Sequence, residues 1–186
     1  TGNVAIGYKT LSKQQGQAYK TAVGYYSQRD SSKSTYYNTS ICAYSMEYNR
    51  TGVYNTGLGL SALRSSDSSS YNTAIGADAM YFHRKNNSNV AVGAFAMRGD
   101  STGFWNTAVG SETMDVTGAN STSHSSVAVG FRALRKVKTG IENTAVGVGA
   151  MEEDSSGNYN TAVGRYASFL NKRGDYNTSM GINAAR

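Results

Sequence analysis

A short repeat runs through the whole chain and restricts its fold more than any other feature. The pattern Asn-Thr-Ala-Val-Gly-x-x-Ala-Met recurs, and its glycine position falls at Gly7, Gly24, Cys42, Gly59, Gly76, Gly93, Gly110, Gly130, Gly147, Gly164 and Gly181. Eight of the ten intervals are 17 residues long, one is 18 and one is 20. The extra residues fall in the polar stretches 30–37 and 117–125, where surface loops absorb insertions. Eleven copies at this period predict a solenoid with one coil per copy.

The residues before the glycine position alternate as in a β-strand. The position directly before it is aliphatic, the next is small, and the one before that is Thr or Val. This alternation of period two gives a strand with one bulky face and one face of small residues. The aliphatic column is Ile6, Val23, Ile41, Leu58, Ile75, Val92, Val109, Val129, Val146, Val163 and Met180.

A helical solenoid is excluded by the same pattern. Gly, Thr, Val and Asn are poor helix formers, and 17 residues are too few for two helices. We therefore predict an all-β protein, a parallel β-solenoid of about eleven coils, with two short strands joined by turns in each coil. Coils about 4.8 Å apart would make a rod roughly 50 Å long.

The small residues indicate a narrow coil interior, so the aliphatic column should point outward. Burying each such side chain is worth about 1.5–3 kcal/mol, and a lone chain would leave them all as one apolar stripe. We therefore expect a cyclic homo-oligomer with this column as the interface. The alternative is a wider, monomeric solenoid with the aliphatic residues inside and the alanines outside.

Two further columns accompany the strand. Asparagine precedes it at Asn3, Asn38, Asn55, Asn72, Asn89, Asn106, Asn143, Asn160 and Asn177, with Lys20 and Ser126 as exceptions. Asn accepts the left-handed conformation in turns and forms side-chain ladders between stacked strands. Three residues earlier, Gly52, Gly103, Gly140, Gly157 and Gly174 indicate the outer turn.

The residue before the Asn column is aromatic in seven copies, which places a line of rings on the outer edge. They are Tyr19, Tyr37, Tyr54, Tyr71, Trp105, Tyr159 and Tyr176. Two interpretations remain open: rings that stack and stabilise the solenoid, or a ligand-binding surface on which polysaccharide stacks.

Charge favours an anionic partner. The net charge is +6, and basic residues gather in the segments between strands at Arg29, Lys33, Arg84, Lys85, Arg132, Arg135, Lys136, Lys138, Lys172 and Arg173. Such a surface attracts anionic glycans such as lipopolysaccharide over long range; alternatively it is a solvated rim that prevents aggregation. No nucleic-acid-binding motif occurs, so a nucleic-acid partner is not expected.

Catalytic chemistry finds little support in the sequence. His83 and His124 lie about 40 residues apart in expected loops, and 152–154, Glu-Glu-Asp, is expected to be a solvated turn. Cys42 is interpreted as a replacement for a small neighbour. We expect no enzyme activity, no metal and no cofactor. An ice-binding role would need a flat exposed Thr face and is disfavoured, because the Thr column shares the face expected to be buried.

No run of about 18 apolar residues is present, so membrane insertion is not expected. The first residue is Thr, and the residues after it show neither a charged nor an apolar segment of a signal peptide, so none is expected in this stretch. We interpret 1–186 as a single repeat domain and a fragment of a longer fibrous protein.

The copies NTAVGSETM, NTAIGADAM and NTAVGRYAS resemble two groups of proteins. NVAIG and NVAVG are similar to the heads of trimeric autotransporter adhesins of the YadA type, whereas the longer period and the Asn-Thr opening are similar to the repeat regions of bacteriophage tail fibres. The resemblance implies a left-handed, homotrimeric β-roll. It further implies a host-attachment fibre segment in a virion that displays loops for cell-surface glycan. The alternatives are an adhesin head on a bacterial surface or a structural spacer whose binding tip lies elsewhere.

Overall fold

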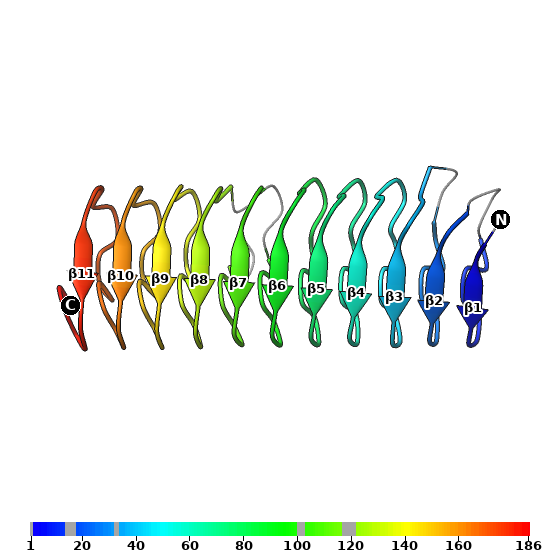
Figure 1. Cartoon of the computed structure of the whole chain (residues 1–186), viewed down its shortest axis with the longest axis horizontal. Coiled ribbons are helices and arrows are strands. Elements are labelled where there is room, and N and C mark those ends of the chain that lie inside the picture. Colours follow the sequence, from blue (N-terminus) through cyan, green and yellow to red (C-terminus); the bar gives the residue numbers. More distant parts are fainter. Residues whose placement is uncertain (1, 14–17, 32–33, 100–102, 117–121) are drawn as a thin grey trace.

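The computed structural model describes residues 2–13, 18–31, 34–99, 103–116 and 122–186. It holds eleven three-residue strands: β1 (Val4–Ile6), β2 (Thr21–Val23), β3 (Thr39–Ile41), β4 (Thr56–Leu58), β5 (Thr73–Ile75), β6 (Val90–Val92), β7 (Thr107–Val109), β8 (Val127–Val129), β9 (Thr144–Val146), β10 (Thr161–Val163) and β11 (Thr178–Met180). All strands pair in parallel in chain order, and they stand side by side along an elongated body with the termini at opposite ends (Figure 1). The described residues contain no helix. The predicted all-β solenoid with one coil per repeat is therefore confirmed.

The pairing register of the strands is unchanged across the two repeat intervals that are longer than 17 residues. Across the 18-residue interval Thr21 pairs with Thr39, and across the 20-residue interval Thr107 pairs with Val127. The extra residues are thus absorbed between strands, as expected. Positions 32–33 and 117–121 of these two insertions lie outside the described residues.

Each coil contains one regular β-strand, whereas we predicted two. The opposite side is a chain of turns in which several backbone hydrogen bonds join one coil to the next, such as Asp78 N to Leu60 O at 2.9 Å and Leu63 N to Ala79 O at 3.0 Å. On this side left-handed residues such as Ser61 (φ 56°) and Leu63 (φ 52°) interrupt the extended backbone that a regular strand needs. Isolated bridges occur elsewhere, three residues before the strands, as between Ser70 and Asn87.

The coil interior is filled by small residues and by Leu or Met. The central strand residues Ala22, Ala74, Ala91, Ala108, Ala128, Ala145 and Ala162 are fully buried. Facing them are the equally buried Met46, Leu63, Met80, Met97, Leu134 and Met151. At Gly57 an added Cβ would lie 2.8 Å from Ser45 Oγ, so even alanine would require its neighbours to shift there. Because the alanines lie inside, the alternative with an aliphatic interior is wrong for this chain.

Left-handed backbone conformations recur at fixed positions in every coil. The Leu/Met residues adopt them, as at Leu63 (φ 52°) and Met80 (φ 52°), and so does the residue before Asn, as at Tyr54 (φ 56°). Such conformations are costly in bulky residues and persist only where the surrounding structure enforces them. Although Asn tolerates this conformation, the residue before each Asn of the column from Asn38 onward adopts it instead.

Glycine is needed at two positions for different reasons. Gly93 has φ of 136°, and a Cβ there would lie 2.4 Å from Gly110 O on the next coil. The outer-turn Gly52 has no left-handed φ, but a Cβ there would clash with the backbone oxygen of Ser69. Its role is therefore close approach between coils and not backbone conformation.

Candidate functional site

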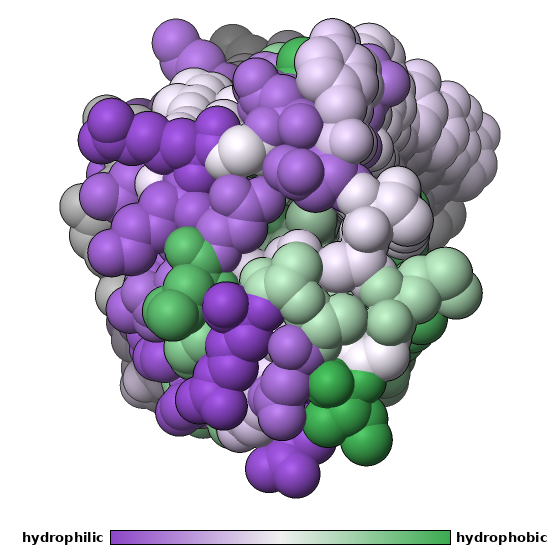
Figure 2. Space-filling model, turned by 90° about the vertical axis from the view of Figure 1, so that its left-hand side faces the viewer, coloured by the Kyte–Doolittle hydropathy of each residue, from purple (hydrophilic) through white to green (hydrophobic). Residues whose placement is uncertain are grey.

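One face of the solenoid is apolar and uncovered in the single chain. Along each strand the two outer residues point away from the interior, and in β7 and β9 the terminal Val109 and Val146 are each 37% exposed. Seen from the C-terminal end, most hydrophobic residues gather on one side of the molecule, and hydrophilic residues predominate on the opposite side (Figure 2). The aliphatic column and its Thr/Val neighbours thus form one face, which we call the strand face; its residues are half-buried or exposed, as expected for this column.

The aromatic column lies on the outer edge, as its position in the repeat predicts. Four rings form a continuous stack: Tyr19 to Tyr37 at 5.1 Å between centroids, Tyr37 to Tyr54 at 4.8 Å, and Tyr54 to Tyr71 at 5.1 Å. The interplanar angles are 2°, 8° and 8°. Tyr159 and Tyr176 form a second stack at 4.9 Å. The rings therefore stack on one another as one of the two interpretations requires.

This stacking limits what the column can bind. A ring inside the stack has both faces covered by neighbours, so a sugar reaches only its edge and hydroxyl. Trp105 differs, because the same position is Ser88 in the preceding coil and Ser125 in the following one. Trp105 is accordingly 68% exposed, against 48% for Tyr54. The open aromatic faces are thus at the breaks in the column.

Ion pairs between coils take up many of the basic residues. Glu47 is buried and lies between Arg29, at 3.0 Å, and Arg64, at 2.8 Å. Arg98 pairs with Asp115 at 3.1 Å, and burial of this carboxyl raises its pKa although Arg98 opposes the shift. Arg132 and Arg135 both approach Glu112, at 3.0 and 3.2 Å. These residues stabilise the stack of coils and are not a uniformly solvated rim.

Of the basic residues named above between strands, five have no acidic partner within the described ranges. They are Arg84, Lys85, Lys138, Lys172 and Arg173. Lys33 lies outside the described residues. All five of these cations are exposed.

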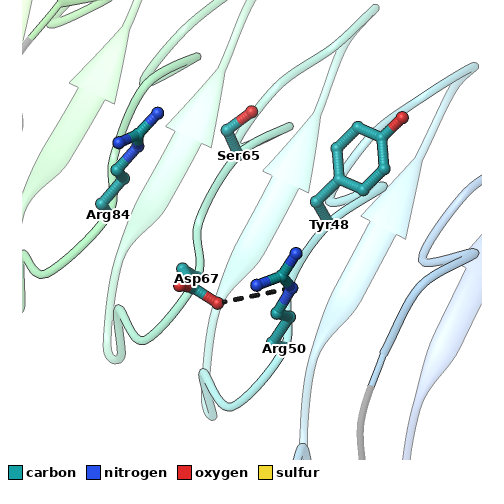
Figure 3. A pocket seen from close by; sticks show the side chains of 5 residues that line it. All are labelled: Tyr48, Arg50, Ser65, Asp67 and Arg84. Carbon is teal, nitrogen blue, oxygen red and sulfur yellow. Dashed lines mark ion pairs between the residues drawn. The ribbon is translucent and has the colours of Figure 1, made fainter.

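A hollow of about 300 Å³ opens beside one of these cations, between three consecutive coils. Its lining residues are Tyr48, Arg50, Ser65, Asp67 and Arg84 (Figure 3). Arg50 Nε lies 3.7 Å from Asp67 Oδ1, an exposed ion pair. Our sequence interpretation did not single out this hollow. The repeat spacing could have indicated it, because Arg50, Asp67 and Arg84 each lie eight residues after the glycine position of successive repeats.

The histidines are structural in this fold. His83 lies between strands, as expected, but it is fully buried, with Asn86 Nδ2 2.9 Å from its Nδ1 and Asn89 Nδ2 3.2 Å from its Nε2. His124 stacks on Phe104 at 5.3 Å, and its Nδ1 accepts a hydrogen bond from the Phe104 backbone N–H.

The acidic run 152–154 is not the solvated turn that we expected. Glu152 is buried near Arg135, and Asp154 is fully buried. Asp154 Oδ1 accepts the backbone N–H groups of Gly157, at 2.8 Å, and Ser156, at 3.2 Å. Burial raises the pKa of Asp154. Glu153 pairs with Lys136 at 2.7 Å, so the three carboxylates hold turns and coils in place.

Two exceptions in the repeat have distinct surroundings. Lys20, which replaces an Asn, is fully buried, and its Nζ bonds to the hydroxyls of Ser31 and Thr35. Burial lowers the pKa of Lys20 to about 8. Cys42, in the glycine column, has φ of 98°, below the 118–140° of the glycines at that position.

Among the described residues, no His, Cys, Asp and Glu side chains cluster as metal ligands would. A search of the same residues for a helix with the length and apolar character to cross a membrane finds none. Comparison with protein-family models, with curated proteins and with solved structures gives no match for the chain.

Proposed function

We propose that this chain is a rigid segment of a homotrimeric attachment fibre of the bacteriophage tail-fibre kind, which binds cell-surface glycan. In this proposal three left-handed β-rolls run in parallel, and the strand faces of the three copies bury one another. The fibre is part of a virion; a bacterial surface is the location if the chain belongs to an adhesin head. No catalytic step is assigned to it.

The observation that supports the trimer is the uncovered strand face. The coil interior is filled by other residues, and outward side chains such as Val109 and Val146 keep 37% of their surface exposed. A stripe of this kind extends over eleven strands, whereas a soluble monomer rarely exposes so long an apolar surface. Copies related by an axis parallel to the rod would cover every strand in the same way.

Glycan binding is supported by exposed aromatic faces and unpaired cations on the outer edge. Trp105 offers open ring faces, and Arg84 and Lys85 lie in the outer turns without acidic partners in the described part of the chain. A spacer with its binding tip elsewhere is the second candidate, favoured by the tyrosine stack, whose rings cover one another.

Binding of the fluorescently labelled protein to bacterial cells and to purified lipopolysaccharide separates the two candidates. The attachment proposal predicts saturable binding that falls at least fivefold in Trp105→Ala, with Phe82→Ala, another exposed aromatic residue, as the matched control. A spacer would bind no cells, or would bind equally well in both variants.

A further inference from the structure

We infer that the hollow between Tyr48, Arg50, Ser65, Asp67 and Arg84 is a subsite for one acidic sugar unit that carries a carboxylate. The inference rests on the proposed function and names the ligand class for one position on the same fibre. Figure 3 shows the five side chains bordering one space, with the Arg50–Asp67 ion pair on one side and Arg84 across from it.

The charge of the hollow selects a monoanion. Arg50 and Asp67 neutralise each other across 3.7 Å, which leaves the Arg84 guanidinium without an acidic partner among the described residues. A guanidinium binds a carboxylate through two parallel hydrogen bonds. A phosphate monoester, with about two negative charges, would exceed the single net positive charge that Arg50, Asp67 and Arg84 together give the hollow. The balance therefore favours a carboxylate over a dianionic phosphate.

The polar lining suits the hydroxyl groups of a sugar ring. Asp67 offers carboxylate oxygens that accept hydrogen bonds from hydroxyls, and the Ser65 hydroxyl makes no hydrogen bond within the described chain. The volume of about 300 Å³ lies at the lower end of ligand sites, as one monosaccharide requires.

Tyr48 forms a fixed wall of this hollow. Its hydroxyl accepts a hydrogen bond from Arg29 Nη2 at 3.2 Å, and the Arg29 and Arg64 guanidiniums lie 5.5 and 5.9 Å from its ring centroid. These two arginines are themselves held by the buried Glu47. The wall is thus positioned before a ligand arrives, which lowers the entropic cost of binding.

Calorimetric titration with a glucuronic-acid oligosaccharide, a glucose oligosaccharide of equal length and inorganic phosphate tests the inference on the whole chain. We expect the acidic oligosaccharide to bind at least tenfold more tightly than the neutral one and more tightly than phosphate. Arg84→Gln should weaken its binding at least fivefold. Lys138→Gln, which removes one exposed cation at the equivalent repeat position, should weaken it less than twofold. Asp67→Asn should increase phosphate binding.

Equal losses in Arg84→Gln and Lys138→Gln would overturn the subsite and indicate diffuse attraction, leaving attachment itself intact. Equal affinity for the neutral oligosaccharide, or stronger binding of phosphate, would overturn the assigned ligand class. Absence of acidic-sugar binding in the wild-type protein would also overturn it, and cell binding then decides independently whether the attachment proposal fails.

Discussion

The Asn55 side chain binds the Asn72 turn of the next coil through both ends of its amide. Its Oδ1 accepts the backbone N–H of Asn72 at 3.0 Å, and its Nδ2 donates to Ser69 O at 2.8 Å. Asn72 repeats this on the following coil, with Asn89 N at 3.0 Å and Asn86 O at 2.9 Å. The asparagine column therefore links neighbouring coils by satisfying buried backbone groups that a strand ladder does not reach.

Replacing one asparagine of this ladder should destabilise the solenoid. In Asn72→Ala, Asn89 N and Asn86 O lose their partners in a buried environment, at about 1–3 kcal/mol for each group. We expect a clear drop in the urea midpoint, with the exposed Ser88→Ala as a control that changes it little. Similar midpoints for the two variants would contradict the role assigned to the ladder.

At the glycine position of the repeat, replacing glycine should destabilise the protein, whereas introducing glycine should stabilise it. Gly93→Ala places a Cβ 2.4 Å from the backbone oxygen of Gly110 and forces a disfavoured φ, so we expect a loss of several kcal/mol or failure to fold. The reverse change, Cys42→Gly, removes a side chain from a strained position and should raise stability by about 1–3 kcal/mol. Thermal unfolding measures both, and destabilisation by Cys42→Gly would contradict the account.

Lys20 should make stability depend on pH. Its pKa in the folded chain is about 8, below the 10.5 of the unfolded chain, so the folded state binds the proton more weakly. Burial of the charged Lys20 therefore lowers the free energy of unfolding by up to about 3 kcal/mol. This loss of stability is fully present below pH 8 and disappears as the pH rises toward 10.5.

Lys20→Asn restores the ladder residue and should stabilise the protein at pH 7, with the advantage shrinking between pH 8 and 10. The difference between variant and wild type cancels the titration of the tyrosines, which is common to both. An advantage that does not change with pH would show that Lys20 is not desolvated as described.

Two aromatic substitutions should have opposite effects. Tyr54 stacks on a ring at each side, so Tyr54→Ala should lower stability by about 1–3 kcal/mol and affect glycan binding little. Trp105 has no stacked neighbour in the column, so Trp105→Ala should leave the urea midpoint nearly unchanged and reduce binding. The reverse pattern would place binding on the tyrosine stack.

Most of the fold could be predicted because the repeat fixes the strand pattern. The small, buried Ala74 between the outward Thr73 and Ile75 follows from an alternation of period two, and the asparagine ladder follows from a column of identical residues. The single strand per coil could not be predicted, since left-handed turns at Leu63 and Met80 contradict the ordinary preference of those residues.

The candidate site was predictable only in part. The aromatic line follows from its column, but which ring faces stay open depends on neighbours such as Ser88. Arg29 pairs with Glu47, whereas Arg84 has no acidic partner in the part of the chain that the structure describes. This difference depends on side-chain geometry between coils. The burial of His83 and Asp154 was missed because polar residues between strands are ordinarily solvated.

The strand face is most directly tested by the native molar mass from light scattering, since the central claim is that copies of the chain cover it. We predict three times the 19.8 kDa of one chain. Val109→Lys, on the strand face, should reduce this to a single chain, whereas Leu170→Lys, exposed between strands, should not. A wild-type mass of 19.8 kDa would contradict the claim.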